Sequence, residues 1–360
     1  MPASSPVAEP PCNVSPMGVR VGIGLFTAQI PAGSDRTFER EYRETLELVR
    51  LAERLGFDSA WVSEHHGSSD GYLPSQLALL AALAAVTERI RLGTGVILAP
   101  LHDPLRLAED AAVVDQLSGG RLVLGLGNGW REEEFRMFDS SRAERGARTE
   151  ETVEVLRRAW TGRRFSFEGR TLRYDRVRIT PRPARPEGIP IVLGGYDRRA
   201  VLRAGRLGDG YVTDESGPEE MRDSLALVDE GAAGVGRDPT TLAIVVLQNA
   251  FAWREGDPWP MLHDGVAHQL GTYAAWGEGA DTPELDRLDP LPPSEEDLRA
   301  STPTGTPQEV LGTLMPVVHE FGDRDLQLVV RLHYPGMDLE TAGRAVETFA
   351  AEVMPVLQAG

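Results

Sequence analysis

Apolar positions follow two alternating patterns from Val19 onward. Short apolar runs, such as residues 19–27 and 91–100, are typical of buried strands. Between them stand longer segments in which apolar residues recur every third or fourth position, as in residues 35–57, and this spacing lines one face of a helix. Gly56 stands where such a helix would need its C-terminal cap. The pattern therefore predicts strands and helices in alternation.

Eight apolar runs have the character of strands, and predicted helices separate them. The runs are residues 19–27, 58–66, 91–100, 121–129, 189–195, 210–214, 241–253 and 325–334. This order predicts an α/β fold, a parallel sheet with crossover helices closed as a (β/α)8 barrel, or TIM barrel. An open doubly wound sheet is the alternative, but eight units would make it unusually wide, and no complete G-x-G-x-x-G opens the first helix. We therefore predict one barrel domain over residues 18–360.

Three segments fall outside this alternation. Residues 1–17 are rich in Pro, Ser and Ala and lack the apolar region of a signal peptide, so we expect a disordered tail. Residues 165–186 are polar, and we expect a small hairpin there. Residues 254–306 are rich in Pro, Gly, Asp and Glu, and we expect an irregular insertion. This insertion is either a lid or binding loop or a tolerated surface insertion, and the sequence favours neither.

The chain is strongly acidic. Its 360 residues include 55 Asp and Glu against 37 Lys and Arg, which gives a formal net charge of −18. This charge repels nucleic acid and anionic lipid, and no apolar run is long enough to span a membrane, so we expect neither as a partner. The single cysteine, Cys12, allows no internal disulfide, and we expect a cytoplasmic protein. A phosphate-bearing ligand would need local backbone amides or a few arginines.

The sequence WVSEHH ends the second strand-like run with three ionisable side chains, Glu64, His65 and His66. In a parallel barrel, reaction centres lie where strands end and the following loops begin. Successive strand residues point to opposite sides, so Glu64 and His66 share one side and His65 points the other way. One histidine should therefore face the barrel mouth, where an imidazole can exchange protons near neutral pH. Histidines held only by local hydrogen bonds are the plainer alternative.

Glycine-rich turns follow the fourth and fifth strand-like runs, in GLGNGW (125–130) and GGYDRR (194–199). Glycines at a strand-to-helix turn let backbone amides approach a ligand, and a helix N-terminus attracts an anion. On so acidic a chain, a phosphate would bind here, and Arg198 and Arg199 would add positive charge. Small residues in GTGVIL (93–98) suit a flat ligand lying against the backbone. Tight packing would account for the same glycines.

Several motifs of hydrolytic enzymes are missing. The chain has no H-E-x-x-H, no G-x-S-x-G and no pair of carboxylates suited to glycoside cleavage. A metal-dependent barrel hydrolase that uses Glu64 and His66 is the rival from a different enzyme class. We predict no metal, and a metal analysis of the purified protein tests this prediction.

These motifs together resemble those of the bacterial luciferase-like flavin monooxygenase superfamily. The resemblance rests on FDSAWVSEHH, on TERIRLGTGVILAPLHDPLRLAEDAAVVDQLSGGRLVLGLGNGW with EEEF close behind, on IPIVLGG and on GTPQEV. It implies a flavin across the barrel mouth, with its ring beside the third strand. The family often has a non-prolyl cis peptide there, and the matching bond joins Gly95 and Val96. The family's catalytic histidine corresponds to His65.

The resemblance also implies which residues contact the ligands. Glu64, His65 and His66 would form a proton-handling station at the flavin face. The cofactor-binding residues would be Thr94, Gly95, Val96, Gly127, Asn128, Gly194, Gly195, Tyr196 and Arg199. The residues at strand ends that shape the substrate pocket would be Phe26, Trp130, Gln248, His333 and Tyr334. The substrate itself is not identified.

The implied chemistry is oxidation of a small organic substrate by O2 and reduced FMN, through a C4a-peroxyflavin. No nicotinamide site is apparent, so a separate NAD(P)H:flavin reductase would supply reduced FMN, and family members are often homodimers. Gly127 and Asn128 stand where the luciferases proper have a reactive cysteine and a phosphate-binding arginine, so light emission is not implied and the phosphate is one cation short. GNGWREEEF is closer to members that use a deazaflavin and transfer hydride without oxygen. The EHH motif favours FMN, which is our first expectation, with deazaflavin as the alternative.

Overall fold

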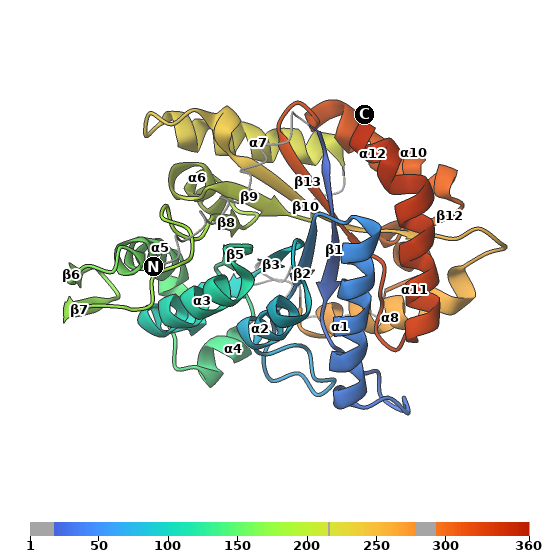
Figure 1. Cartoon of the computed structure of the whole chain (residues 1–360), viewed down its shortest axis with the longest axis horizontal. Coiled ribbons are helices and arrows are strands. Elements are labelled where there is room, and N and C mark those ends of the chain that lie inside the picture. The colour runs from blue at the N-terminus through green and yellow to red at the C-terminus, as the bar shows by residue number, and fades with distance from the viewer. Residues whose placement is uncertain (1–17, 215–216, 278–292, 360) are drawn as a thin grey trace, which may run out of the picture.

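A computed structural model of the chain describes residues 18–214, 217–277 and 293–359 (Figure 1). The predicted tail at residues 1–17, with Cys12 within it, lies outside the described residues. Parallel strands form the centre of the molecule, and helices surround them (Figure 1). This arrangement is the one that the alternating pattern predicts.

The central sheet is a closed barrel of eight parallel strands. In the order in which they pair, the strands are β3 (Arg91–Thr94), β2 (Ser59–Val62), β1 (Arg20–Phe26), β13 (Asp325–Arg331), β10 (Ala243–Asn249), β9 (Gly210–Thr213), β8 (Ile191–Gly194) and β5 (Leu122–Gly127). Pairing of Leu92 with Leu122 joins β3 to β5 and closes the circle. The predicted (β/α)8 barrel is therefore confirmed, and the open sheet is excluded.

The third barrel strand is broken near its carboxyl end. After β3, the chain pairs with β5 again at β4 (Ile97–Leu98). Gly95 and Val96 stand between the two pieces, and the peptide bond that joins them is cis, as the resemblance implies. A second non-prolyl cis bond joins Gly24 to Leu25 near the end of β1. Both bonds therefore lie at the same end of the barrel.

Alternation of side chains along the strands divides the core into two layers. Inside the barrel, Trp61 packs with inward-facing valines of five other strands: Val123, Val192, Val212, Val245 and Val329. Outward-facing residues such as Ile23 and Leu328 belong to the larger cluster that packs against the helices. Because side chains fill the barrel interior, a ligand site belongs at the carboxyl ends of the strands.

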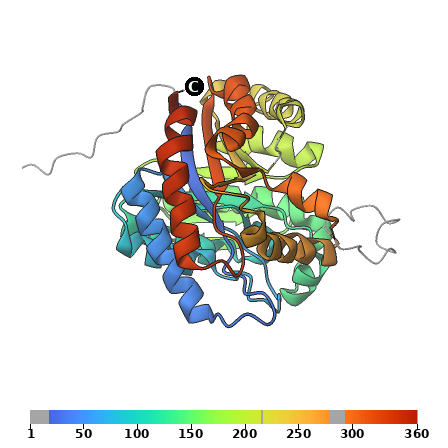
Figure 2. The same cartoon turned by 90° about the vertical axis from the view of Figure 1, so that its right-hand side faces the viewer.

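Helices follow the strands and cover the barrel. They are α1 (Phe38–Leu55), α2 (Gln76–Val86), α3 (Pro104–Ser118), α4 (Glu132–Met137), α5 (Arg145–Trp160), α6 (Arg198–Leu207), α7 (Pro218–Ala233), α8 (Trp259–Ala275), α9 (Glu295–Ser301), α10 (Pro307–Phe321), α11 (Leu339–Thr348) and α12 (Met354–Ala359). Figure 2 shows α1 and α11 side by side on the outside. As predicted, α1 ends at Gly56, which is in the left-handed conformation.

The segment 254–306 contains more regular structure than its composition suggests. Helices α8 and α9 lie within it, so the expectation of an irregular stretch is wrong for these described residues. Two of the buried positions of α8 are Gly265 and Gln269. Because neither residue is apolar in the usual sense, the helix lacks the clear apolar stripe by which sequence reasoning finds helices.

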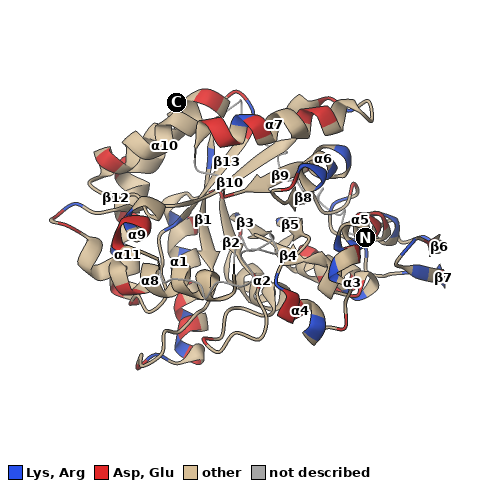
Figure 3. Cartoon of the chain, turned by 180° about the vertical axis from the view of Figure 1, so that it is seen from behind, with Lys and Arg blue, Asp and Glu red and all other residues tan. Residues whose placement is uncertain are grey.

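The hairpin expected within residues 165–186 is present. It consists of the antiparallel strands β6 (Phe165–Glu168) and β7 (Arg173–Val177). Figure 3 shows basic residues on this hairpin and on α6, and acidic residues along α7. Within the described ranges, every helix is too short or too polar to cross a lipid bilayer.

Candidate active site

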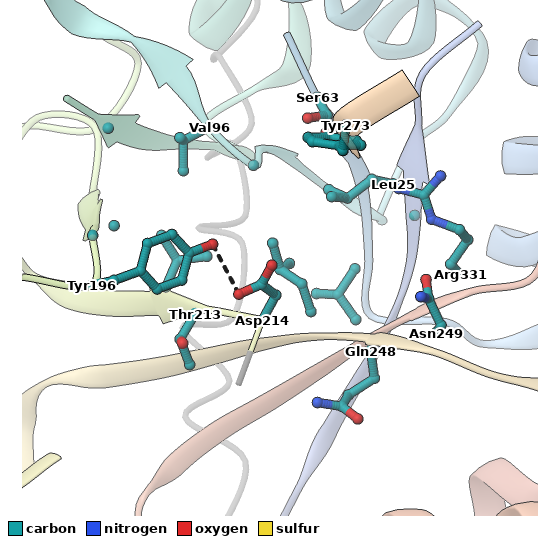
Figure 4. Close-up of a pocket in the computed structure, with 18 of the residues that line it drawn as sticks. Leu25, Ser63, Val96, Tyr196, Thr213, Asp214, Gln248, Asn249, Tyr273 and Arg331 are labelled. Carbon is teal, nitrogen blue, oxygen red and sulfur yellow. Dashed lines mark hydrogen bonds between the residues drawn. The ribbon is translucent and has the colours of Figure 1, made fainter. Parts of the chain in front are cut away.

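The carboxyl ends of the barrel strands surround a cavity of about 560 Å³. Eleven residues predicted for the site line it: Glu64, His65, Gly95, Val96, Gly127, Asn128, Trp130, Gly194, Gly195, Tyr196 and Gln248. They come from strands and loops far apart in the sequence, and barrel closure brings them together (Figure 4). A cavity of this size can hold a ring-shaped cofactor together with a small substrate.

His65 lies at the cavity wall with one side of its ring held in place. The side chain is buried, and its Nδ1 lies 2.9 Å from Oε1 of Glu134. The same oxygen accepts the backbone N–H of His66 at 2.9 Å. Beside a carboxylate, Nδ1 of the neutral imidazole carries the proton, so Nε2 of His65 has the lone pair that can accept another.

The short helix α4, which follows β5, positions Glu134. Its N-cap residue Arg131 donates from Nη1 to the carbonyl oxygen of His66 at 2.7 Å. The Arg131 guanidinium also lies 4.3 Å from the ring centroid of Trp276. Sequence reasoning used EEEF as part of the resemblance but gave Glu134 no role. Nothing in the spacing shows which of three consecutive acids is buried, and in the structure it is Glu134.

Aromatic rings surround His65. The ring centroids of Trp276, Tyr72 and Tyr273 lie 4.7, 4.9 and 5.5 Å from that of His65. Tyr273 lies in α8 and Trp276 is its C-cap residue, and the hydroxyl oxygens of Tyr72 and Tyr273 are 2.8 Å apart. Part of the segment 254–306 therefore forms a wall of the cavity. This contact favours the binding-loop interpretation of the segment over a surface insertion.

Glu64 contacts two histidines. Its Oε1 lies 3.1 Å from Nε2 of His66 and 2.9 Å from Nε2 of His102. Burial raises the pKa of Glu64, but the charge and hydrogen bond of His102 and the hydrogen bond of His66 outweigh it and lower the pKa to about 2. Burial lowers the pKa of His102, but the neighbouring Glu64 outweighs this effect and raises it.

The ligand atoms of Glu64, His66 and His102 lie within 4.8 Å of one another. Both histidine contacts have the lengths of hydrogen bonds, so a buried ion pair accounts for the arrangement. Such a spacing would also suit a metal ion with two imidazole ligands and one carboxylate. The prediction of no metal is therefore untested, and the rival metal-dependent hydrolase would have His102 as a third ligand that sequence reasoning missed.

The turn after β8 forms a cradle of backbone at one end of the cavity. Gly195 has a φ of +154°, and a Cβ at this position would lie 2.5 Å from the Cβ of Ala200, so only glycine fits. The hydroxyl of Tyr196 donates to Oδ1 of Asp214 at 2.9 Å (Figure 4). The turn thus presents backbone to the cavity, as expected for a phosphate site.

The positive charge at this end of the cavity comes from an arginine other than Arg198 and Arg199, which the sequence analysis named. Arg199 does not line the cavity, and Arg198 pairs with Glu230 at 2.8 Å. The first amides of α6 do not face an open anion site, because the N-cap residue Asp197 accepts the N–H groups of residues 199 and 200. Arg145, the first residue of α5, lines the cavity instead. Arg145 therefore supplies a positive charge near the predicted phosphate site. The sequence lacks this charge at Asn128, where the luciferases proper have a phosphate-binding arginine.

The wall beside the third and fourth barrel strands is mostly backbone. A Cβ at Gly127 would lie 2.6 Å from Cγ2 of Val96, so a side chain is excluded there. A flat ring can lie against such a wall. The bare wall, the glycine cradle and Arg145 therefore fit a cofactor with a flat ring and a phosphate.

Six residues assigned to the site from the sequence do not line the cavity. They are His66, Thr94, Arg199, Phe26, His333 and Tyr334. The Thr94 hydroxyl donates to the carbonyl of Gly125 at 2.8 Å and accepts its N–H at 2.7 Å, so this side chain joins two strands. His66 faces Phe138, with ring centroids 4.5 Å apart.

Phe26 is misassigned because β1 is irregular. The register between β1 and β2 shifts between Ile23 and Phe26. Simple alternation from the outward-facing Ile23 would turn Phe26 inward, but the shift reverses the two sides. Leu25 lines the cavity, and Phe26 lies in the outer core.

His333 and Tyr334 are misassigned because β13 has already ended. Arg331, its last residue, lines the cavity, and the chain turns away after it. Nε2 of His333 then lies 3.7 Å from Oε1 of Glu41, and the Tyr334 hydroxyl donates to the carbonyl of Arg331 at 3.2 Å. Both side chains pack outside the cavity. Strand alternation does not hold in the loop beyond a strand end.

Comparison with known proteins shows which family the chain belongs to. The sequence profile of the luciferase-like monooxygenases matches residues 19–259. The chain belongs to the luciferase-like monooxygenase family. Its resemblance to the family, inferred from the motifs, is therefore confirmed, and the chain is an enzyme of a family of oxidoreductases.

The proteins that this chain resembles differ in the reaction that their names state. The F420-dependent glucose-6-phosphate dehydrogenase of Intrasporangium calvum is 30% identical over 330 residues, which cover 88% of this chain and 95% of that protein. The F420-dependent hydroxymycolic acid dehydrogenase of Mycobacterium tuberculosis is 30% identical over 324 residues, covering 86% and 83%. The crystal structure of monooxygenase RslO1 from Streptomyces bottropensis has a TM-score of 0.76 and 27% identity, covering 94% and 99%.

Proposed function

We propose that this enzyme is a deazaflavin-dependent oxidoreductase that interconverts an alcohol and a carbonyl compound by hydride transfer. The sequence motifs favoured FMN and O2, with deazaflavin as the alternative. The two dehydrogenases named as F420-dependent support the alternative, because each match extends over more than four-fifths of the chain. The similarity to the monooxygenase RslO1 keeps a monooxygenase, for which the sequence motifs favour FMN, as the second candidate.

The observation that carries the proposal is the pairing of His65 with Glu134 at the cavity wall. When bound, the deazaflavin would accept a hydride from the alcohol carbon. Nε2 of His65 would take the hydroxyl proton, so that the alcohol becomes a carbonyl compound. Glu134 would hold the proton on Nδ1 and stabilise the imidazolium that forms. The rings around His65 would keep water from this proton.

The cavity divides between cofactor and substrate. The backbone wall at Gly127 would support the cofactor ring, and the cradle at Gly194 and Gly195 with Arg145 would hold its phosphate. The substrate would then lie between this ring and His65. A separate flavin reductase would be needed only if the enzyme is the FMN-dependent monooxygenase. The homodimer and the cytoplasmic location stay predictions for both candidates.

Cofactor binding separates the two candidate functions. We expect oxidised F420 to bind the purified protein with a Kd on the order of micromolar, and FMN to bind at least about tenfold more weakly. Fluorescence titration measures both constants on the same preparation. Tighter binding of FMN, together with O2 consumption in the presence of reduced FMN, would favour the monooxygenase.

The role of His65 is tested with the same preparation. We expect His65→Ala to leave the Kd for F420 within about twofold and to slow deazaflavin reduction by a panel of alcohols by on the order of a hundredfold. His319→Ala is the matched control, because this histidine is exposed on α10 and away from the cavity. An unchanged rate in the His65 variant would remove this residue from the mechanism.

A further inference from the structure

Arg331 is a buried cation at the cavity for which neither the family motifs nor the proposed mechanism provides a role. It is the last residue of β13, it lines the cavity, and only 5% of its surface is exposed. Its Nη1 is fully buried and has no hydrogen-bond partner within the described ranges. Most buried polar atoms in proteins are hydrogen-bonded, so this one indicates a missing partner.

The groups around Arg331 do not neutralise its charge. No carboxylate in the described part of the chain forms an ion pair with it. Burial lowers the pKa of His333 and raises the pKa of Tyr334, so both neighbours are held in their neutral forms. A guanidinium removed from water loses hydration that only a nearby anion or several acceptors can replace.

The position of Arg331 separates it from the cofactor cradle. β13 pairs with β1 on one side and with β10 on the other, where Arg331 lies opposite Asn249. The cradle belongs to β8, which lies three strands away in one direction and five in the other. In Figure 4, Arg331 lies at the far side of the pocket from Tyr196. Only β1 separates β13 from β2, after which His65 stands.

We propose that Arg331 binds a carboxylate or phosphate group of the substrate, and that the substrate is a small anionic alcohol or its carbonyl counterpart. The planar guanidinium can donate two parallel hydrogen bonds to such a group. The anion takes no part in the reaction and fixes the reacting carbon in front of His65. This inference rests on the proposed function for the reaction, but the anion site itself can be tested without the cofactor.

Binding without cofactor is the first arm of the test. The probes are lactate and glycerophosphate, with isopropanol and glycerol as their uncharged counterparts. We expect the two anions to raise the melting temperature of the wild-type protein and the uncharged compounds to leave it unchanged. Arg331→Met should weaken lactate binding by at least about tenfold, whereas Arg198→Met, on the surface of α6, should not change it.

Retained glycerophosphate binding in Arg331→Met would place that anion at the phosphate cradle rather than at Arg331. Retained lactate binding in the same variant would overturn the proposal. If Arg331→Met does not fold, Arg331→Lys keeps the charge but loses the planar fork. We expect it to weaken lactate binding by about tenfold, and unchanged binding would again contradict the proposal.

Turnover is the second arm. With F420 bound, we expect wild-type kcat/KM to favour each anion over its uncharged counterpart by about a hundredfold, and Arg331→Met to reduce this preference to within about fivefold. The Kd for F420 should stay within about twofold. A large loss of F420 affinity would instead assign Arg331 to the cofactor ring. Failure of F420 to bind the wild type would overturn the proposed function, but the cofactor-free arm would still decide the anion site.

Discussion

Burial and neighbours set the state of single side chains at this site. Glu64 is fully surrounded by protein, yet its two histidine partners keep it ionised, and Glu64 in turn raises the pKa of His102. His65, in the loop after β2, receives its orientation from Glu134 on helix α4. Arg331 is the opposite case, since nothing in the described ranges neutralises it.

The Glu64–His102 pair makes stability depend on pH in a definite direction. The pKa of Glu64 lies below its ordinary value of 4.5, so its contribution is present above that pH and is lost as pH falls toward 2. The pKa of His102 lies above 6.5, so its contribution is present below that pH and is lost as pH rises through the native pKa. The pair should therefore stabilise the fold most between pH 4.5 and 6.5.

Thermal unfolding of the wild type and of His102→Gln checks this expectation. We expect the wild type to melt a few degrees higher than the variant near pH 5.5, and the difference to shrink on either side of that pH. A difference that is constant from pH 3 to pH 9 would contradict the ion pair. A melting temperature that falls on addition of a chelator would instead favour a metal at this cluster.

Residue-level prediction succeeded where strand geometry decides the outcome. Strand alternation predicted that one histidine faces the barrel mouth, and in the structure His65 lines the cavity whereas His66 does not. Glu64 contacts His66 as alternation predicts, but it also lines the cavity. Sequence reasoning gave no role to Glu134, because its position depends on how α4 packs. It also gave none to Arg331, because the sequence does not show where β13 ends. Both depend on tertiary packing, which leaves no periodic signal in the chain.

At the scale of elements, regular patterns were reliable and irregularities were not. All eight barrel strands follow from their apolar runs, and α1 follows from its spacing and its C-terminal glycine. Helix α8 was missed because two of its buried positions are Gly265 and Gln269. The register shift in β1 has no sequence signal, and it moved Phe26 out of the pocket. The architecture could therefore be predicted, but one wall of the cavity could not.

The turn after β8 provides a test at this scale. In Gly195→Ala, the new Cβ would meet that of Ala200 in a backbone conformation that L residues rarely adopt, so the turn must shift. We expect the Kd for the cofactor to rise by at least about tenfold, because backbone amides would no longer face its phosphate. Fluorescence titration of the cofactor measures the change.

Gly312→Ala is the control for this variant. Gly312 lies within α10, and apart from its chain neighbours and the backbone of its own helix, no atom lies within 4 Å of where its Cβ would be. This substitution should leave cofactor affinity unchanged and stabilise the helix by about 0.5–1 kcal/mol. Equal cofactor affinity in Gly195→Ala and Gly312→Ala would show that the turn does not hold the phosphate.

At the scale of the whole molecule, a chain with a net charge of −18 contains a pocket that holds a buried cation. The overall field repels an approaching anion, whereas Arg331 attracts it only after entry. Salt screens interactions over distances of about 10 Å and affects buried pairs much less. The two effects can therefore be separated by ionic strength.

We expect kcat/KM for glycerophosphate to rise by about twofold to fivefold as salt increases from a low to a physiological concentration, because screening removes the repulsion. The value for glycerol should stay constant over the same range. Steady-state kinetics at a series of salt concentrations measure both. A fall with salt would show that the local potential at the cavity entrance is positive.

His65 and Glu134 reach each other across a single strand of the barrel wall, because His65 follows β2, Glu134 follows β5, and β3 pairs with both strands. The 2.9 Å contact that carries the proposed chemistry therefore exists only while β2, β3 and β5 remain in register. A preparation that retains helical content but has lost this alignment would be inactive, so catalysis reports the closure of the barrel between β3 and β5 more strictly than circular dichroism does.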